Sequence, residues 1–320
     1  MVTKKDLSFF AKATYTIDKK WTIFGDLQER FVKYSTSGLT SDGVPLLIDE
    51  SYAFFNPKFG TTFKINQIQN VYFSYARANR EPNRNDFENG ITKPEALNDF
   101  ELGWRFSDQT TRLNANLFYM GYKDQLVLTG ELDDVGNPVR ATSGDSYRFG
   151  IELDASIKFL KKWTIMPNLA LSTNKNTDFV TSVDGELISL GETNIAFSPE
   201  VVASNMLLFQ PMDNFSVGLL SKFVGQQYMG NTDSETSKLD SYFVHDFNAS
   251  YQLAKSWIFQ SVAFNLLVNN LFNTEYVSNG YFYTYDDTWS VPGEITTIET
   301  PGYYPQAEIN FLFGVTLKFK

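Results

Sequence analysis

Apolar and polar side chains alternate along most of this chain, and most regularly in its last segment, from Pro305 to Lys320. One face of this segment carries the apolar residues Ala307, Ile309, Phe311, Phe313, Val315, Leu317 and Phe319. The other face carries Gln306, Glu308, Asn310, Gly314, Thr316 and Lys318, with Leu312 as the apolar exception. Strict alternation is typical of a strand with one apolar and one polar face. Because a tilted strand of about 9–11 residues crosses a bilayer, the pattern predicts a transmembrane β-strand.

The same pattern recurs throughout the chain and segregates charge. Between residues 147 and 159, the charged side chains Arg148, Glu152, Asp154 and Lys158 all avoid the face that carries Phe149, Ile151 and Leu153. A charge facing lipid at mid-membrane costs roughly 2–4 kcal/mol, which explains this segregation. We predict about thirteen such strands. Their approximate ranges are 7–17, 21–35, 51–65, 69–78, 97–107, 111–129, 145–159, 163–175, 196–209, 215–228, 240–253, 258–270 and 305–320.

The connections between these strands alternate between short turns and long loops. The long loops cover residues 36–50, 79–96, 130–144, 176–195, 229–239 and 271–304. Short periplasmic turns and long outer loops are typical of bacterial outer-membrane barrels. A soluble β-sandwich also alternates, but it would not usually combine long strands with this regular loop pattern. The sequence therefore predicts an all-β fold, an antiparallel transmembrane β-barrel.

Three short turns repeat one chemistry, with lysine and then tryptophan at the start of the following strand. They are Lys19-Lys20-Trp21, Lys161-Lys162-Trp163 and Lys255-Ser256-Trp257. Tryptophan prefers the headgroup level of a membrane, and lysine reaches from there into water. These turns indicate one rim of the barrel.

The first and last predicted strands both run towards the short turns. Bacterial single-chain barrels have even strand numbers and close with antiparallel neighbours. We therefore expect at least one further strand before Met1, so that the chain is an incomplete part of a larger barrel. The start of the chain shows no signal peptide, so we expect a mature or truncated protein.

Composition narrows the function class. Aromatic residues make up 16% of the chain, whereas the mean hydropathy is only −0.25, as expected when each strand has one wet face. No run of about 18 apolar residues could form a membrane helix. A net charge of −10 argues against a nucleic-acid partner.

Four sequence elements, in order, resemble the C-terminal part of TonB-dependent outer-membrane receptors, especially those of Bacteroidetes-type bacteria. They are the segment from Val71 to Gly103 with its Lys93-Pro94-Glu95 and Glu101-Leu102-Gly103 motifs, the segment from Leu117 to Gly130, the Val268–Tyr276 segment (VNNLFNTEY), and the final strand. The resemblance extends over residues 1–320. It implies a barrel of about 22 strands, of which this chain supplies the C-terminal part.

The resemblance also implies a function and partners. Such a receptor resides in the outer membrane of a Gram-negative bacterium and takes up a scarce substrate with energy from the TonB complex. A ferric siderophore or similar metal chelate is the expected substrate, and outer-membrane lipid surrounds the barrel. The plug domain through which TonB acts is not visible in this chain, and no resident cofactor is implied.

Two groups of residues are candidates for substrate binding. Arg77, Arg80 and Arg84 lie at the end of a strand and in its loop, where a basic cluster could attract an anionic chelate. Alternatively, these arginines pair with Glu81, Asp86 and Glu88. Tyr281, Tyr283, Tyr285 and Trp289 lie in the last long loop and could stack on a ligand. Alternatively, they pack against other loops or form an aromatic belt.

The sequence gives little support for a catalytic function. The chain has no cysteine, and its one histidine, His245, is followed by Asp246, which a strand would place on the opposite face. We predict no catalytic residue and no metal site, and hence no enzyme. Two rival functions remain, a passive porin-like or adhesion barrel and an outer-membrane hydrolase barrel.

Overall fold

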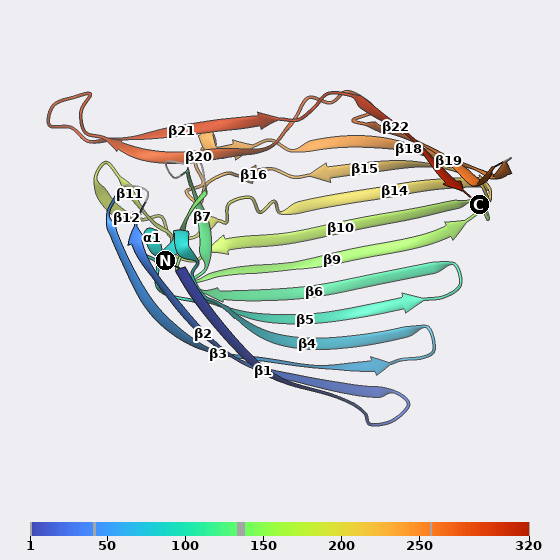
Figure 1. The fold of residues 1–320 in the computed structure, drawn as a ribbon, viewed down its shortest axis with the longest axis horizontal. Helices are drawn as coiled ribbons and strands as arrows, with labels where there is room; N and C mark the ends of the chain where they lie inside the picture. The colour runs from blue at the N-terminus through green and yellow to red at the C-terminus, as the bar shows by residue number, and fades with distance from the viewer. Residues whose placement is uncertain (1, 41–42, 133–137, 257, 320) are drawn as a thin grey trace.

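The computed structural model describes residues 2–40, 43–132, 138–256 and 258–319. Most of these residues form one 14-stranded antiparallel sheet, drawn in Figure 1. Thirteen of its strands follow one another in chain order, and the short β13 (Thr193–Asn194) pairs with β10 beside this path. The thirteen are β1 (Val2–Thr16), β2 (Trp21–Leu39), β3 (Pro45–Lys64), β4 (Gln69–Arg80), β5 (Glu95–Ser107), β6 (Thr111–Lys123), β9 (Ser146–Phe159), β10 (Trp163–Asn176), β14 (Val201–Met212), β15 (Phe215–Val224), β18 (Tyr242–Ser256), β19 (Phe259–Asn269) and β22 (Asn310–Phe319). The predicted all-β, antiparallel architecture is confirmed.

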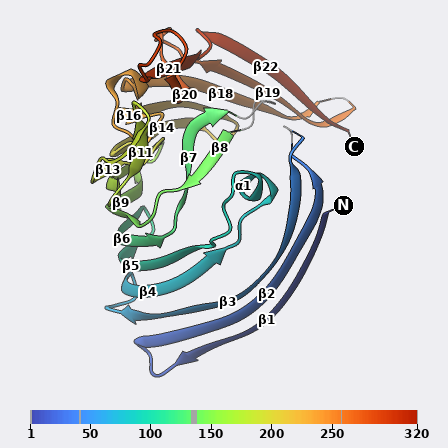
Figure 2. The same ribbon diagram turned by 90° about the vertical axis from the view of Figure 1, so that its left-hand side faces the viewer.

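The sheet curls around its polar face. Figure 2 shows the strands following a C-shaped path, with α1 (Arg84–Glu88), β7 (Leu126–Leu132) and β8 (Pro138–Thr142) on the concave side. Phe87 of α1 stacks on Tyr34 of β2 at 5.0 Å between ring centroids, so Tyr34 and its alternate neighbours line the concave face. The opposite, convex face carries exposed apolar side chains, such as Phe59, Phe73 and Leu102. This is the arrangement of a barrel with a wet interior and an apolar exterior.

Close packing on the concave face depends on glycine. Tyr72 of β4 lies across Gly103 of β5, where an added Cβ would come within 2.1 Å of the tyrosine ring. The hydroxyl of Tyr72 donates to Asn116 on β6 at 2.9 Å, and Arg105 lies over its ring at 4.2 Å. The tyrosine therefore joins three neighbouring strands across a position that only glycine can occupy.

Two of the short turns are closed by aspartate. Asp18 accepts hydrogen bonds from the backbone N–H groups of Lys20 and Trp21, both at 2.7 Å. Asp108 does the same for Thr110 and Thr111 at 2.8 and 2.7 Å. Such side-chain turns replace backbone bonds where the chain reverses.

Two of the predicted rim tryptophans pack on phenylalanines of neighbouring strands. The ring centroids are 4.6 Å apart for Trp21 and Phe63, and 4.3 Å apart for Trp163 and Phe209. The third predicted rim tryptophan, Trp257, lies outside the described residues.

The sheet does not close on itself in the described part of the chain. The edge strands β1 and β22 each pair with one neighbour, β2 and β19 respectively. Both edge strands run towards the short-turn end in Figure 1, as expected from the alternation. No helix among the described residues is long and apolar enough to cross a membrane.

Several predicted strand limits were wrong. β1 and β3 begin earlier than predicted, at Val2 and Pro45, and β2 extends to Leu39, so most of the loop expected over 36–50 is strand. β15 ends at Val224 rather than at residue 228.

Three further limits differ because an apolar stretch continues beyond the end of the strand. The strand expected over 111–129 ends at Lys123, since Asp124 adopts a φ of 50°, and β7 begins after the break. The strand expected over 196–209 begins at Val201, because Phe197 has a φ of 52°. The strand expected over 305–320 begins at Asn310, since Pro305 belongs to the preceding strand.

The long loops contain secondary structure that the sequence analysis did not predict. The β7–β8 hairpin lies in one loop, and the β11 (Val180–Val183) and β12 (Glu186–Ser189) hairpin lies in the next. The loop between β15 and β18 holds β16 (Gln227–Tyr228), a 3-10 helix over Glu235–Ser237 and β17 (Lys238–Leu239). The last long loop forms a hairpin of β20 (Val277–Asp287) and β21 (Thr296–Pro305).

Candidate functional site

Four aromatic side chains form one continuous row on the β20–β21 hairpin. Tyr281, Tyr283 and Tyr285 alternate along β20, and the ring centroids of successive tyrosines are 6.3 Å apart. Trp289 extends the row beyond the strand and lies parallel to Tyr285 at 5.8 Å, with an interplanar angle of 1°. Tyr285 is 40% exposed and Trp289 is 69% exposed. The structure therefore brings together all four aromatic residues that the sequence analysis singled out.

Small residues on the partner strand give this row its shape. Tyr281 pairs with Gly302 of β21, and an added Cβ at Gly302 would lie 2.1 Å from the tyrosine ring. The ring of Tyr281 therefore lies flat across the hairpin and also contacts Tyr304, with 5.9 Å between centroids. The result is an aromatic platform with open faces at its outer end.

The opposite face of the hairpin is buried. Phe282, only 1% exposed, packs against Met229 and Leu239 of the β15–β18 loop, and Phe197 and Val277 complete the cluster. Gly280 allows the two strands and Met229 to approach closely, because an added Cβ would lie 2.3 Å from the carbonyl oxygen of Gly302. The aromatic row is thus the exposed face of the β20–β21 hairpin, and the buried Phe282 cluster holds the opposite face.

Polar contacts fix the hairpin to the 3-10 helix of the β15–β18 loop. Glu299 of β21 accepts a hydrogen bond from the hydroxyl of Ser234 at 2.7 Å and another from the hydroxyl of Thr236. The hydroxyl of Tyr303 donates to the carbonyl oxygen of Thr236 at 3.0 Å. Several hydrogen bonds from one strand to one short helix restrain both elements.

The same hairpin is tied to the β11–β12 hairpin. The backbone N–H of Asp184 donates to the hydroxyl of Thr297 at 2.7 Å, and the N–H of Thr297 donates back to the Asp184 carboxylate at 2.8 Å. Asp286 accepts from Ser182 at 2.9 Å and from Thr297 at 2.7 Å. We call the three linked segments, 180–189, 228–239 and 277–305, the outer-loop unit. It holds the aromatic row in a fixed position at the loop end of the sheet.

The three arginines do not form the basic cluster that was expected from the sequence. In the register of β4 and β5, Arg77 lies opposite Asn98. The side chain of Asn98 accepts a hydrogen bond from the hydroxyl of Tyr75 at 2.9 Å. Arg77 and Tyr75 are two positions apart on β4, so both belong to the convex face. Arg80 forms an ion pair with Glu95 at 3.1 Å, and Arg84 forms one with Glu88 at 2.6 Å. Two of the three charges are thus matched locally, and the third points away from the concave side.

A different charged cluster occupies the concave face, and the sequence analysis missed it. Arg30 donates two hydrogen bonds to Glu81, both at 2.8 Å, and also donates to Asp6, with the shortest contact at 2.6 Å. Lys4 also binds Glu81, at 2.6 Å. Alternation places Asp6 and Arg30 on the polar face, but only the folded loop reveals that Glu81 joins them. The cluster connects β1 and β2 to the loop that carries α1.

This cluster predicts a pH-dependent loop. Burial alone would raise the pKa of Glu81, but the hydrogen bonds from Arg30 and Lys4 outweigh it and lower that pKa to about 2, from an ordinary value of 4.5. A lowered carboxylate pKa stabilises the folded state above the pKa of the unfolded chain, and this stabilisation is lost as the pH falls towards the folded value. The α1 loop should therefore loosen between about pH 4.5 and 2. Because the chain has no cysteine, a spin label on Asn85→Cys would report the mobility of α1 directly.

The control for this titration is Glu81→Gln. This variant should show a more mobile label at neutral pH and should lose the transition on acidification. An unchanged transition in Glu81→Gln would show that another group controls the loop.

His245 lies on the convex face among aromatic rings. Its ring meets Phe243 at 4.3 Å and Phe272 at 4.8 Å, both edge-on. Asp246 lies on the other face and accepts from the backbone N–H of Asn270 at 2.8 Å, as the alternation predicted. The described residues contain no group of three or more His, Cys, Asp or Glu side chains placed to hold a metal ion.

Comparison with known proteins identifies the family. The family model described as TonB dependent receptor-like, beta-barrel matches residues 2–271. The catecholate siderophore receptor Fiu of Escherichia coli (strain K12) is 24% identical over 249 residues, which cover 71% of this chain and 30% of that receptor. The ferric-pyoverdine 358 receptor of Pseudomonas putida is 25% identical over 241 residues, which cover 69% of this chain and 26% of that receptor. The chain thus spans less than a third of the length of these relatives.

Solved structures show the same fold. The ferric-catecholate import receptor Fiu of E. coli K12 in its closed form superposes with a TM-score of 0.71 at 18% identity, covering 99% of this chain and 45% of that one. The copper transporter OprC superposes with a TM-score of 0.70 at 16% identity, covering 98% and 48%. Proteins of the matched family are outer-membrane β-barrels of Gram-negative bacteria. The chain belongs to the TonB-dependent receptor-like β-barrel family.

Proposed function

We propose that this chain is the C-terminal barrel portion of an outer-membrane receptor that takes up a ferric siderophore or a similar metal chelate. The observation that carries the proposal is the aromatic row of Tyr281, Tyr283, Tyr285 and Trp289, held at the loop end by the outer-loop unit. Flat, partly exposed rings on a rigid support favour stacking on a planar or aromatic ligand. The names of the relatives, a catecholate siderophore receptor and a ferric-pyoverdine receptor, point to the same ligand class.

The rest of the receptor is part of this proposal. Unpaired strand edges are not tolerated in lipid, so β1 and β22 require further strands of the same barrel. A plug domain that lies outside residues 1–320 would occupy the concave side, and TonB would act on that plug to release the substrate. The protein would reside in the outer membrane of a Gram-negative bacterium. We propose that this bacterium is of the Bacteroidetes type, because the sequence motifs resemble those receptors.

The aromatic row also favours a binding function over catalysis. The four aromatic residues do not form a pair of general acid and general base. Arg80 and Arg84 already form ion pairs with Glu95 and Glu88. An electrostatic role for Arg77, Arg80 and Arg84 would therefore require these contacts to rearrange on ligand binding. We propose stacking as the first contribution to affinity and charge as a secondary one.

Replacing Tyr285 by alanine should weaken binding of a ferric catecholate about tenfold, because one stacked ring contributes on the order of 1 kcal/mol beyond its buried area. Equilibrium binding to the protein in detergent would measure this. Tyr119→Ala is a matched control, since Tyr119 is a 45% exposed tyrosine on the convex face of β6. Equal losses in both variants, or no loss in either, would contradict a role for the row.

Transport distinguishes the proposal from a passive channel or an adhesion barrel. Cells that express the protein should accumulate the iron-labelled chelate only while the membrane is energised. Uptake that persists after addition of a protonophore would instead indicate a passive pore. Binding without any uptake would favour an adhesion barrel.

A further inference from the structure

The three outer loops that contain the outer-loop unit are strongly acidic. Residues 177–200, between β10 and β14, carry five carboxylates and no lysine or arginine. Residues 225–241, between β15 and β18, carry three carboxylates and one lysine, and residues 270–309, between β19 and β22, carry six carboxylates and no lysine or arginine. Their excess of thirteen negative charges is larger than the net charge of −10 of the whole chain. The negative charge of the molecule is therefore concentrated at the end that carries the aromatic row.

Neutral donors rather than cations hold these carboxylates. Asp286, for example, accepts hydrogen bonds from the hydroxyls of Thr297 and Ser182. These two hydrogen bonds lower the pKa of Asp286 below its ordinary value, so the carboxylate is ionised at neutral pH. Among the described residues, the one ion pair of these three loops joins Lys238 to Glu235, at 3.2 Å. The other carboxylates of the loops thus keep a charge that no lysine or arginine compensates.

Two of these carboxylates border the outer end of the aromatic row. Asp287 follows Tyr285 on the same alternate face of β20. Its carboxylate accepts hydrogen bonds from the backbone N–H groups of Trp289 and Ser290, both at 3.0 Å. Glu294 is exposed in the turn that joins β20 to β21. The most exposed rings of the row therefore lie beside negative charge.

The ring faces of the row favour the same sign of ligand charge as the carboxylates do. The face of an aromatic ring is the negative part of its quadrupole and attracts a cation. In the described part of the chain, lysine or arginine lies over the rings of Phe63, Tyr72 and Tyr228, but not over any ring of the row. A ligand ammonium or guanidinium group over Tyr285 or Trp289 would be attracted by the ring and by the nearby carboxylates. A ligand carboxylate or phenolate at the same place would be repelled by both.

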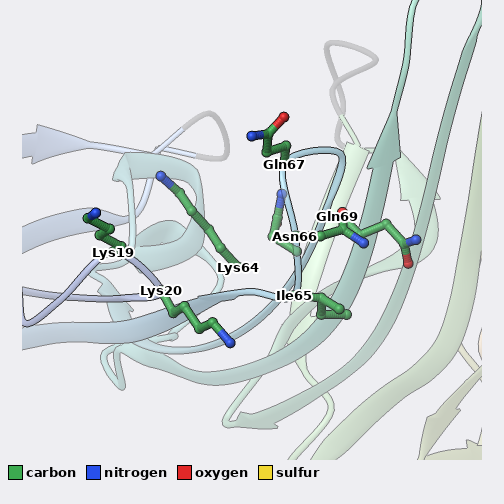
Figure 3. Close-up of a pocket in the computed structure, with 8 residues that line it drawn as sticks. Lys19, Lys20, Lys64, Ile65, Asn66, Gln67 and Gln69 are labelled. Carbon is green, nitrogen blue, oxygen red and sulfur yellow. The ribbon is translucent and has the colours of Figure 1, made fainter.

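The positive side chains at the opposite end of the sheet form no comparable site for an anion. Lys19, Lys20 and Lys64 border one pocket at the short turns. Figure 3 shows Lys19 and Lys64 extending to one side and Lys20 extending to the other, so the three ammonium groups do not meet at one point. Ring faces and charge of one sign coincide instead at the aromatic row.

We propose that the ligand of the aromatic row is a metal chelate that carries cationic groups, such as ammonium or guanidinium substituents on its planar arms, and not a polyanionic chelate. This inference rests on the proposed function, since it specifies the charge of the ligand for the same site. A planar arm stacks along the row, and its cationic group lies over Tyr285 and Trp289, beside Asp287 and Glu294. The negative field of the three loops attracts such a ligand before contact and repels an anionic one.

The test compares two synthetic ferric tris-catecholate chelates that differ only in the groups at the ends of their arms. One chelate ends in neutral amides and is anionic, and the other ends in quaternary ammonium groups. Equilibrium binding to the protein in detergent should favour the ammonium-bearing chelate about tenfold at low salt. This preference should shrink at high salt, because salt screens exposed charges. Equal affinities, or a preference for the amide-bearing chelate, would overturn the proposal.

The variant D287N/E294Q removes the two charges beside the row and keeps the side-chain oxygen of residue 287 that accepts the backbone hydrogen bonds. It should reduce the preference for the ammonium-bearing chelate to about twofold. The matched control is D18N/D108N, because Asp18 and Asp108 accept the same kind of backbone hydrogen bonds at the short-turn end. The control removes the same charge from the molecule and should keep the tenfold preference. Equal losses in the two variants would replace a defined site by an effect of net charge and overturn the proposal.

Tyr285→Ala separates a failure of this inference from a failure of the proposed function. The variant should weaken binding of both chelates, because each stacks a planar arm on the row. If it does so while the wild-type protein prefers the amide-bearing chelate, the row binds chelates and only the inferred ligand charge is wrong. If neither chelate binds, or if both bind equally well without the ring of Tyr285, the proposed function fails and this inference fails with it.

Discussion

Replacing Phe282 by alanine is expected to release the β20–β21 hairpin from the outer-loop unit while the 14-stranded sheet stays intact. Phe282 is the largest side chain of a small buried cluster with Met229 and Leu239. Only the partly buried side chains of Phe197 and Val277 pack against this cluster. Truncating a fully buried phenylalanine costs about 3–5 kcal/mol. Since this cluster is separate from the sheet, the loss should appear locally, as faster hydrogen exchange over residues 277–305.

Tyr285→Ala distinguishes the two roles of β20, namely attachment of the hairpin through Phe282 and ligand binding through Tyr285. Tyr285 points away from the cluster and is 40% exposed, so its loss should leave hydrogen exchange in the hairpin nearly unchanged. Phe282→Ala should therefore reduce both local protection and ligand affinity, whereas Tyr285→Ala should reduce affinity alone. Wild-type exchange rates in Phe282→Ala would show that the contacts of Glu299 and Thr297 suffice to hold the hairpin.

The strands of the sheet could be predicted from the sequence because their signal is local. A period of two, interrupted by turn residues, needs no knowledge of distant contacts, and it located all thirteen strands of the main path. The strand ends were less predictable. Asp124 and Phe197 adopt positive φ values, which the apolar pattern does not reveal, because the apolar residues next to them still fit a strand. Hairpins within the long loops escaped prediction, since their short strands have few alternating positions.

The two candidate groups fared differently for a physical reason. The row of Tyr281, Tyr283 and Tyr285 follows directly from alternate spacing on one strand, whatever the strand packs against. The arginine cluster required three side chains to converge from a strand and a loop, which spacing does not determine. Alternation in fact opposed it, because Arg77 shares the parity of Phe73 and Tyr75 and so belongs to the convex face.

Long-range ion pairs were beyond the reach of sequence reasoning. Arg30 and Glu81 are 51 positions apart, and Lys4 and Glu81 are 77 apart. Their meeting depends on how the loop after β4 folds back over the concave face. The pairing of Arg84 with Glu88, four positions apart in one helical turn, was among the alternatives foreseen, because that contact is local.

Replacing Arg30 by methionine is expected to free the α1 loop from the sheet. Arg30 is the only residue of the described structure that binds both Asp6 and Glu81, and its loss leaves Glu81, whose side chain is 8% exposed, with Lys4 alone. Removing one partner of a fully buried ion pair costs about 3–5 kcal/mol, because an uncompensated charge stays behind. The pair of Arg30 and Glu81 is partly buried and Glu81 keeps Lys4, so we expect about 2 kcal/mol, as for hydrogen bonds to charged groups. A spin label at Asn85→Cys should become mobile at neutral pH, as we also expect for the label in the otherwise unchanged protein near pH 2.

Lys33→Met provides the matched control on the same strand. Lys33 pairs with Asp49 at 3.3 Å, but these two side chains are 56% and 64% exposed, so the loss should stay within about 1 kcal/mol and leave the label immobile. The double variant Arg30→Met/Glu81→Met should be less mobile than Arg30→Met, since it removes the stranded carboxylate. An immobile label in Arg30→Met would mean that the stacking of Phe87 on Tyr34 holds the loop without help from the charges.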